Sequence, residues 1–351
     1  MANTKAYAAQ SETSDIAPFE FERREPRPDD VSIEIDYCGV CHSDIHIAQN
    51  DWGVSVYPVV PGHEIVGRVT AVGPRVSHYK VGDVVGVGVM VDSCRSCSAC
   101  DAGLEQYCLE GMTGTYNGKD RHDGSITFGG YSDQIVVAEH FVVKIPEKLD
   151  VKAAAPLLCA GITTYSPLRH YGVKAGDKVG VIGMGGLGHM GVKFASALGA
   201  EVTIFTRSES KVAEAKKQGA DHVVVSTDKA QMKAAAETFD FMLDTVPVPH
   251  DINPYLRTLK YDGTHILVGL LQPMESYLDS GALVLKRRVL AGSLIGGMPE
   301  TQEMLEFCAK HDISCDVEML DIQNINNAYE RMKAGDVKYR FVIDMASLKS
   351  A

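Results

Sequence analysis

The stretch V-G-V-I-G-M-G-G-L-G, Val179 to Gly188, places Gly183, Gly185 and Gly188 in the spacing G-x-G-x-x-G. An apolar run precedes these glycines and a helical pattern follows them, so the sequence predicts a strand, a tight turn and a helix. In such a turn the first glycine permits the sharp reversal, the second lets a pyrophosphate approach the backbone, and the third allows close packing of helix on strand. Phosphate groups are also attracted to a helix N-terminus. We therefore expect a dinucleotide-binding loop, whose other contacting residues are Met184, Gly186 and Leu187.

Short apolar strands alternate with helical stretches on the C-terminal side of this loop. This alternation predicts a parallel, doubly wound sheet with right-handed crossovers, and therefore a Rossmann domain. The expected strands are Lys178–Ile182, Glu201–Phe205, His222–Val225, Phe241–Asp244, His265–Val268 and Val289–Ala291, and the expected helices are Gly186–Leu198 and Ser210–Gln218.

The chain before Asp150 consists of short β-type runs broken by glycine and proline, which are typical of antiparallel strands. After Gly297 come two helices and a strand that we expect to pack on this first domain. The fold class is therefore α/β, with residues 1–160 and 295–351 in a β-rich domain and residues 161–294 in the dinucleotide-binding domain. The expected elements are the strands Val31–Tyr37, Glu64–Val72, Val84–Met90 and Tyr131–Val137, the helices Thr301–His311 and Ile325–Ala334, and the strand Arg340–Asp344.

Four cysteines, Cys94, Cys97, Cys100 and Cys108, follow one another in the spacing C-x2-C-x2-C-x7-C. Four thiolates so close in sequence can surround one ion as a tetrahedral sulfur site, the geometry of structural zinc. Disulfides are the alternative, but the chain has nine cysteines, an odd number, and no other sign of an oxidising compartment. We expect residues 91–111 to form a lobe that folds around a structural zinc ion.

The end of the second expected strand of the Rossmann domain bears on the choice of dinucleotide. An enzyme that uses NAD usually has Asp or Glu there to bond the ribose 2′-hydroxyl. This chain instead has Thr206, Arg207, Ser208 and Lys211. Such side chains bind a 2′-phosphate and favour NADP, although the nearby Glu209 opposes this interpretation. The alternative is that Arg207 and Lys211 are only solvated surface charges.

The composition excludes some classes of partner. The formal net charge is −12, from 46 acidic and 34 basic residues, and the basic residues form no stripe. Binding to nucleic acid or to an anionic membrane is therefore not expected. The segment Met1 to Asp15 is polar without a signal-peptide core, and no apolar stretch is long enough to span a membrane. We expect a cytoplasmic protein.

Cys41, His63 and Cys159 are a second set of side chains that zinc prefers. Long stretches of sequence separate them, so the residues alone leave open buried structural thiols and a core histidine. Their surroundings are more informative. The motifs G-V-C-H-S-D-I-H, V-P-G-H-E, the four-cysteine run, C-A-G-I-T-T-Y-S-P-L and G-M-G-G-L-G-H occur in this order.

Together these motifs resemble the zinc-dependent medium-chain dehydrogenase/reductase superfamily, in its cinnamyl-alcohol-dehydrogenase-like branch, from about Glu25 to Asp344. The resemblance implies that the β-rich domain is GroES-like and catalytic. It also implies reversible hydride transfer between NADPH and an aldehyde, with a primary alcohol as the product. The competing hypotheses are an NAD-dependent alcohol dehydrogenase that acts mainly in oxidation, and a zinc-bearing binding module without catalysis.

The resemblance also implies roles for individual residues. Cys41, His63 and Cys159 would hold a catalytic zinc ion, which Glu64 can transiently join, and Asp44 would orient the ligand histidine. Ser43 and His46 would relay the substrate proton. The residues expected to contact the pyrophosphate are His42 and Arg340, and those expected near the nicotinamide are Thr163, Thr245, Gly269 and Ser293.

The expected substrate channel is apolar with an aromatic side chain, which suits aryl or medium-chain aldehydes. The alternative is that these are simply core residues, an alternative of equal weight for each methionine. The chain is also expected to form a homodimer through the strand Val289 to Leu294, which the sequence leaves open as either an edge strand or an internal strand. The expected channel residues are Trp52, Met90, Met112, Leu270 and Leu294.

Overall fold

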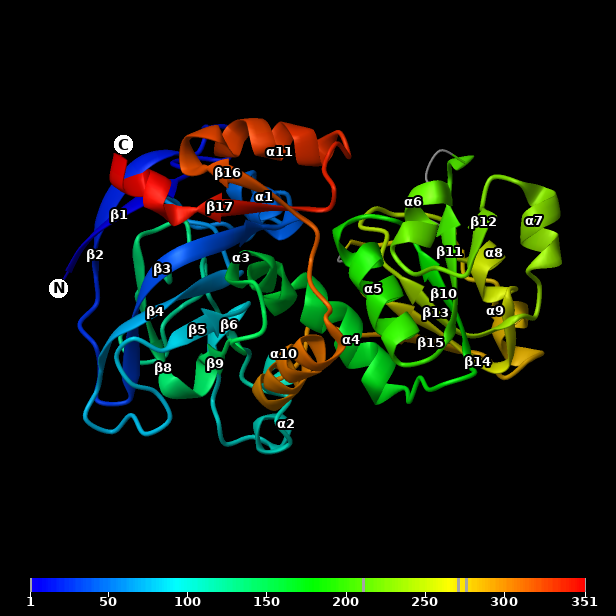
Figure 1. Cartoon of the computed structure of the whole chain (residues 1–351), viewed down its shortest axis with the longest axis horizontal. Helices are drawn as coiled ribbons and strands as arrows, with labels where there is room; N and C mark the ends of the chain where they lie inside the picture. The colour runs from blue at the N-terminus through cyan, green and yellow to red at the C-terminus, as the bar shows by residue number, and fades with distance from the viewer. Residues whose placement is uncertain (1, 210–211, 270–271, 275–276, 351) are drawn as a thin grey trace. The chain divides into compact units, whose positions relative to one another are not determined.

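The computed structural model describes residues 2–209, 212–269, 272–274 and 277–350 (Figure 1). Two residues with predicted ligand contacts, Lys211 and Leu270, lie outside the described residues. The chain divides into two compact units. Unit 1 comprises Met1–Cys159 and Gly296–Ala351, and unit 2 comprises Ala160–Ile295.

Unit 2 contains a six-stranded sheet in which every neighbouring pair of strands is parallel. The sheet order is β12-β11-β10-β13-β14-β15, which counted within the unit is the 3-2-1-4-5-6 order of a Rossmann domain. The strands are β10 (Lys178–Ile182), β11 (Glu201–Thr206), β12 (His222–Val225), β13 (Phe239–Asp244), β14 (Leu259–Leu267) and β15 (Val289–Gly292), and the helices are α4 (Ala160–His170), α5 (Gly186–Ala197), α6 (Val212–Lys217), α7 (Lys229–Ala234), α8 (Asn253–Leu256) and α9 (Ser280–Val284).

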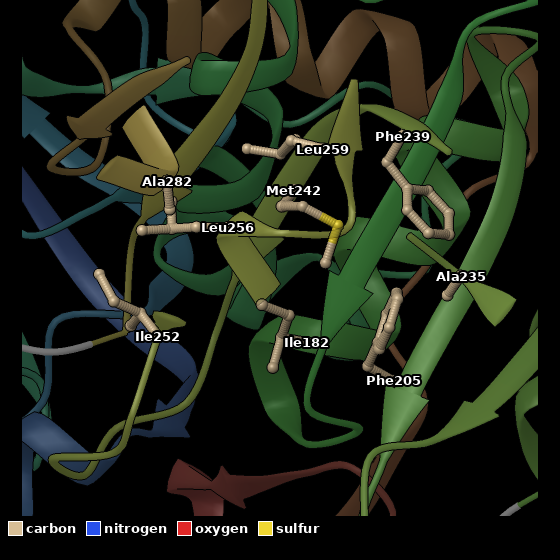
Figure 2. Close-up of a cluster of buried hydrophobic side chains, with 9 residues drawn as sticks. All are labelled: Ile182, Phe205, Ala235, Phe239, Met242, Ile252, Leu256, Leu259 and Ala282. Atoms are coloured by element: carbon tan, nitrogen blue, oxygen red, sulfur yellow. The ribbon is translucent and has the colours of Figure 1, made fainter. Parts of the chain in front are cut away.

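The core of unit 2 lies on both faces of this sheet, because its central strands are apolar at nearly every position. On one face, Ile182, Phe205 and Met242 pack with residues of α8 and α9 (Figure 2). Burial of each such side chain contributes about 1.5–3 kcal/mol. The opposite face carries α5, which approaches closely because Gly191 has no side chain: a Cβ there would lie 2.8 Å from Leu243 Cδ2.

Unit 1 is built on a seven-stranded sheet with the order β16-β17-β3-β4-β5-β9, to which β8 is added beside β3. A separate hairpin, β1–β2, and a short pair, β6–β7, complete its strands. The strands are β1 (Ala2–Ala8), β2 (Ala17–Arg23), β3 (Asp30–Val40), β4 (Ile65–Val72), β5 (Val84–Val87), β6 (Met90–Asp92), β7 (Thr113–Gly114), β8 (Gln134–Ala138), β9 (Val143–Lys144), β16 (Val317–Asp321) and β17 (Arg340–Asp344). The α-helices are α1 (His42–Ala48), α2 (Ser98–Asp101), α3 (Val151–Ala154), α10 (Met298–His311) and α11 (Ile325–Lys333), and the 3-10 helices include η1 (Glu105–Tyr107) and η3 (Ala155–Leu158).

The C-terminal segment belongs to this same sheet. β17 pairs antiparallel with β3, with Val342 opposite Gly39, and it pairs parallel with β16. The last strand therefore lies beside the strand that leads into Cys41.

The fold class expected from the sequence is confirmed, but several elements differ. The predicted strand Val84–Met90 is two strands, β5 and β6, and Gly88 between them lies close to Leu158, whose carbonyl oxygen would be 3.0 Å from a Cβ at that position. The helices α1 and α4 were not predicted. Nearly every residue of α4 is buried, so its sequence has no amphipathic period.

One question that the sequence left open is answered by the fold. β15 pairs with β14 alone among the described strands, so it is an edge strand of the sheet and not an internal one. Within the described ranges, no helix combines the length and apolarity that a membrane span requires.

Candidate metal sites and dinucleotide site

The four cysteines of the lobe lie together around α2 and η1. The sulfur atoms of Cys94, Cys97, Cys100 and Cys108 are all within 4.8 Å of one another, with 3.5 Å between Cys97 and Cys100 and 3.8 Å between Cys94 and Cys100. A tetrahedron with Zn–S bonds of about 2.3 Å has edges of about 3.8 Å, so this group has the size of a zinc tetrathiolate.

Backbone amides point at these sulfurs. Leu109 N–H donates to Cys97 Sγ at 3.4 Å, and Cys94 N–H donates to Cys108 Sγ at 3.3 Å. The backbone amides of Cys100 and Leu109 lower the pKa of Cys97 to about 6. At Cys97 the lobe therefore favours the thiolate, which is the form that binds a metal, whereas burial raises the pKa of Cys100 to about 11.

Arg121 is a cation beside this group that the sequence did not single out. Its guanidinium donates to the backbone oxygens of Gly111 and Glu110, and Nη2 lies 3.8 Å from Cys108 Sγ. Four thiolates around a divalent ion carry a net charge of −2, so a guanidinium there is electrostatically favourable. Arg121 lies thirteen positions beyond Cys108, so no short sequence motif contains both residues.

The second group consists of Cys41, His63, Glu64 and Cys159, whose candidate ligand atoms are also within 4.8 Å of one another. Cys41 follows β3, His63 and Glu64 precede β4, and Cys159 follows η3. The two sulfur atoms are 3.9 Å apart. His63 is buried, and its Nε2 has no hydrogen-bond partner in the described part of the chain. A buried nitrogen of this kind, next to two thiols, fits a metal ligand.

The charge state of Cys41 also suits a ligand. A hydrogen bond with Cys159 lowers the pKa of Cys41 well below its usual value, and the charges of Arg340 and His63 act in the same direction against the effect of burial.

Asp44 organises this second group from the first turn of α1. It is fully buried and accepts hydrogen bonds from Cys41 N–H at 2.8 Å, Gly62 N–H at 3.1 Å and the Tyr131 hydroxyl at 3.2 Å. Its Oδ1 lies 3.4 Å from His63 Nδ1, which is the contact expected from the sequence. Because Nδ1–H faces the carboxylate, the lone pair of Nε2 is directed at the two sulfurs.

Two aromatic residues around Asp44 and His63 were missed by the sequence analysis. Tyr116 stacks on the His63 ring with centroids 5.6 Å apart, and the Tyr329 hydroxyl lies 3.5 Å from that of Tyr131. Neither tyrosine lies in a recognisable ligand motif, so only the fold brings them here.

Glu64 is fully buried and forms an ion pair with the guanidinium of Arg340, which is also buried. Gly39 makes room for this carboxylate, since a Cβ there would lie 2.0 Å from Glu64 Oε2. The structure thus places Arg340, a predicted pyrophosphate contact, next to the candidate metal ligands. His42 is half-buried at the start of α1, and burial lowers its pKa.

The two predicted relay residues lie on α1. Ser43 Oγ is 3.6 Å from Cys41 Sγ, close to the second group. His46 Nδ1 lies 2.7 Å from Asp51 Oδ2, and its ring is 5.1 Å from that of Trp52. Asp51 was not predicted, although it follows His46 by only five residues. Among the other expected channel residues, Met90 is buried, and Met112, Trp52 and Leu294 are half-buried.

The glycine-rich loop of unit 2 joins β10 to α5. Gly183 has a φ of +93°, which disfavours other residues, and a Cβ at Gly188 would lie 2.1 Å from Gly183 O. A Cβ at Gly185 would meet no atom within 4 Å, so this side of the loop is open for a ligand to approach. Met184 is buried, while Gly186 and Leu187 begin α5.

The end of β13 lies next to this loop, at the point where the strand order reverses. Thr245 Oγ1 donates to Ile182 O at 2.7 Å, and a Cβ at Gly269 would lie 2.6 Å from Thr245 C. Three predicted cofactor contacts, Gly183, Thr245 and Gly269, therefore come together where a Rossmann sheet binds its ligand. Ser293 follows β15 and bonds through its N–H to Leu267 O at 3.0 Å.

At the end of β11, Thr206 is buried and its Oγ1 accepts a hydrogen bond from Ser208 N–H at 3.3 Å. Arg207 and Ser208 are exposed, as is Glu209. Thr163 lies buried within α4.

A Rossmann sheet with a glycine-rich loop, in one chain with two zinc-type ligand groups, defines the class of zinc-dependent dehydrogenases. Residues 27–147 match the family described as alcohol dehydrogenase GroES-like domain, and residues 186–310 match the zinc-binding dehydrogenase family. The chain belongs to this zinc-dependent medium-chain dehydrogenase/reductase superfamily, in its cinnamyl-alcohol-dehydrogenase-like branch.

Similar proteins cover nearly the whole chain. It is 55% identical over 345 residues to aldehyde reductase YahK of Escherichia coli (strain K12), covering 98% of this chain and 99% of that protein. It is 53% identical over 352 residues to NADP-dependent alcohol dehydrogenase C 1 of Mycolicibacterium smegmatis, covering 100% of both. Among solved structures, the cinnamyl alcohol dehydrogenase SbCAD4 from Sorghum bicolor superposes with a TM-score of 0.95 at 45% identity and 98% coverage of both chains.

Proposed function

We propose that this protein is a zinc-dependent, NADP(H)-linked alcohol dehydrogenase and aldehyde reductase. It would transfer hydride reversibly between NADPH and aryl or medium-chain aldehydes, with primary alcohols as the reduced products. The observation that carries the proposal is the group formed by Cys41, His63 and Cys159, in which the buried His63 Nε2 lacks a partner within the described residues and Asp44 orients the ring.

A zinc ion held by Cys41, His63 and Cys159 supplies a Lewis acid for the substrate oxygen, and a bound nicotinamide supplies the hydride. The protein contributes orientation and proton transfer. The Ser43 hydroxyl, near Cys41, donates a proton to the substrate oxygen as the alcohol forms. His46 replaces that proton, and Asp51 holds the His46 ring by the bond at Nδ1.

Glu64 acts as an alternative ligand in this proposal. Its ion pair with Arg340 compensates its charge while it is away from the metal. The lobe of residues 91–111 would hold a second, structural zinc ion through its four cysteines.

The glycine loop and the N-terminus of α5 would hold the pyrophosphate of the dinucleotide. NADP is favoured because β11 ends in Thr206, Arg207 and Ser208, which offer hydroxyls and a guanidinium to a 2′-phosphate. A relative named NADP-dependent, at 53% identity, supports the same choice. Glu209, exposed just beyond these residues, favours the alternative of an NAD-dependent enzyme that acts mainly in oxidation.

The proposed substrate is a small aldehyde or alcohol, and the residues of unit 1 proposed to contact it are Trp52, Met90 and Met112. The proposed homodimer uses the edge strand β15, where Val289 is 46% exposed. Light scattering after gel filtration measures the mass directly, and the mass of a single chain would refute the dimer.

The deciding experiment is the initial rate of benzaldehyde reduction with NADPH and with NADH, on protein whose zinc has been counted. Fast NADPH-dependent turnover with two zinc ions per chain is the expected result. Activity with NADH alone would overturn the choice of NADP and leave the mechanism standing. A fully zinc-loaded protein that reduces benzaldehyde with neither cofactor would refute the aryl aldehyde as substrate.

A matched variant tests the dinucleotide choice. Thr206→Asp places a carboxylate at the end of β11, where it repels a 2′-phosphate and can bond a 2′-hydroxyl. We expect KM for NADPH to rise strongly while KM for NADH falls. Equal KM values for NADPH before and after the substitution would remove Thr206 from the cofactor site.

A further inference from the structure

Asp244, the last residue of β13, contacts two histidines. Its Oδ2 lies 2.9 Å from His250 Nε2 and 3.1 Å from His265 Nε2. Asp244 and His265 are fully buried, and the His250 side chain is 18% exposed. This cluster is separate from both cysteine groups, and no role for His250 or His265 follows from the proposed chemistry. It lies at the end of β13, one residue before Thr245.

The hydrogen bonds of His250 determine its protonation. Nε2 faces the Asp244 carboxylate and Nδ1 faces Val248 O at 2.9 Å. A carboxylate and a carbonyl can only accept, so both ring nitrogens of His250 must donate, and the ring is an imidazolium. The hydrogen bond that His250 donates to Asp244 raises the pKa of His250, which agrees with this assignment. His265 bonds the same carboxylate through Nε2, while its Nδ1 has no partner among the described residues.

The segment 245–252, which carries His250, begins with two residues that lie against the glycine-rich loop, Thr245 and Val246. A Cβ placed on Gly183 would be 3.0 Å from Thr245 Oγ1 and 3.4 Å from Val246 Cγ2. Val246 N–H also donates to Asp244 Oδ1 at 3.2 Å. At its other end the segment is anchored by Ile252, which is buried in the apolar cluster of Figure 2. Between these two ends of the segment, His250 forms a hydrogen bond with Asp244.

The charged and titratable groups that face His250 come from several elements. Asp244 of β13 and Asp251 of its own segment are negative and favour the imidazolium. His265 of β14 bonds the same carboxylate, and the Tyr255 ring of α8 lies 6.1 Å from the His250 ring. Arg207 is the cation that acts on Tyr255.

We propose that protonated His250 is a positioning residue that clamps the segment 245–252 against the glycine-rich loop and thereby makes the affinity for NADPH depend on pH. The inference rests on the proposed function for the identity of the cofactor. His250 acts through Asp244, Thr245 and Val246, and it needs no contact of its own with the dinucleotide.

The sign of the dependence follows from linkage. A histidine whose pKa is raised in the folded state is fully charged below the ordinary value of about 6.5, and its contribution is lost as the pH rises through the raised value. The clamp is therefore complete under mildly acidic conditions and weakens under alkaline conditions. The dissociation constant of NADPH should rise by roughly threefold to tenfold across that range, which corresponds to a His250 pKa about half a unit to one unit higher in the NADPH-bound protein than in the free protein.

The test is a fluorescence titration of the full zinc-loaded protein with NADPH across this pH range. NADH, which lacks the 2′-phosphate, is titrated in parallel. The difference between the two titrations gives the contribution that protonation of the 2′-phosphate makes to the pH dependence of NADPH binding. His250→Gln should bind NADPH more weakly at acidic pH and lose the dependence seen in the wild type. The Asp244→Asn variant should also lose this pH dependence of NADPH binding. His222→Gln is the control, because His222 is a histidine of the same sheet that pairs with Glu201 at 3.0 Å, at the start of β12.

A measurement on the wild type guards against misfolded variants. Nuclear magnetic resonance of the His250 ring should show an imidazolium that titrates above the ordinary histidine value. Titration at or below that value would overturn the inference. Tight NADPH binding with the same pH profile in wild type and His250→Gln would also overturn it, while leaving the proposed function intact. A wild-type protein that binds neither dinucleotide would overturn the proposed function and this inference together.

Discussion

Single residues decide the geometry of the candidate catalytic group. Asp44 was predicted from the motif that also contains Cys41, and the structure confirms its contact with His63. Tyr131 donates to the same carboxylate from a position 87 residues away, in a segment without any ligand motif. Local motifs therefore reveal the residues that act, whereas the side chains that hold them in place become visible only in the folded chain.

The first residue-scale prediction concerns Ser43. Ser43→Ala removes the proposed proton donor and should lower kcat by roughly 10²- to 10⁴-fold, while the zinc content stays the same as in the wild type. Ser43→Thr retains a hydroxyl and should keep much of the activity. Rates are measured beside zinc content, and wild-type kcat in the alanine variant would exclude Ser43 from the relay.

The second residue-scale prediction concerns Arg121. Its guanidinium lies beside the four cysteines that would hold the proposed structural zinc, so Arg121→Gln should release that zinc to a chelator several times faster. Arg68→Gln is the matched control, because the Arg68 side chain is 58% exposed and pairs with Asp36 at 3.4 Å, away from the lobe. Zinc release is followed with a colorimetric chelator, and equal rates for both variants would show that Arg121 does not retain the metal.

At the scale of elements, the strand–turn–helix around the glycine loop was predicted correctly, because the residues that indicate it are close together in the sequence. The glycines, the apolar strand and the helical pattern all lie within Lys178–Ala197. The helix α4 was missed for a physical reason. A helix buried on nearly all sides has no polar stripe, and hydrophobic period is the main signal that a sequence offers.

Substitutions at two glycines of the loop should have different effects on stability and on NADPH binding. Gly188→Ala puts a Cβ 2.1 Å from Gly183 O, so it should lower stability by about 1–3 kcal/mol and also weaken NADPH binding. Gly185→Ala meets no protein atom within 4 Å, so stability should be unchanged while NADPH binding is lost to the clash with the pyrophosphate. Thermal unfolding and cofactor titration measure the two effects. Unchanged NADPH affinity in Gly185→Ala would show that the pyrophosphate does not approach this glycine.

At the scale of the whole molecule, ion pairs join distant segments within unit 1. Arg27, between β2 and β3, donates to both oxygens of Asp120 at 3.0 and 2.9 Å and also pairs with Asp123. Burial raises the pKa of Asp120, but hydrogen bonds from Arg27 and from backbone amides outweigh it and lower the value from 3.8 to about 2.

This pair predicts a pH-dependent stability. A depressed carboxyl pKa stabilises the fold above 3.8, and that contribution is lost as the pH falls through about 2. Asp120→Asn should therefore cost about 1–2 kcal/mol at neutral pH, and the difference from wild type should narrow in acid. Asp123→Asn, at a side chain that is 48% exposed, should cost less. Urea unfolding at several pH values measures both, and a difference that stays constant into acid would contradict the assignment.

The sequence by itself determined the two-domain α/β class, the glycine loop and the four-cysteine lobe. Each depends on residues that are close together in the chain, where spacing already dictates geometry. Only the tertiary structure decided that Cys159 lies 3.9 Å from Cys41 across 118 positions, that Arg340 pairs with Glu64, and that His250 and His265 share Asp244. The physical reason is that these residues stand at strand ends or in the connections between elements, far apart in sequence, so their side chains meet only when the sheets have formed.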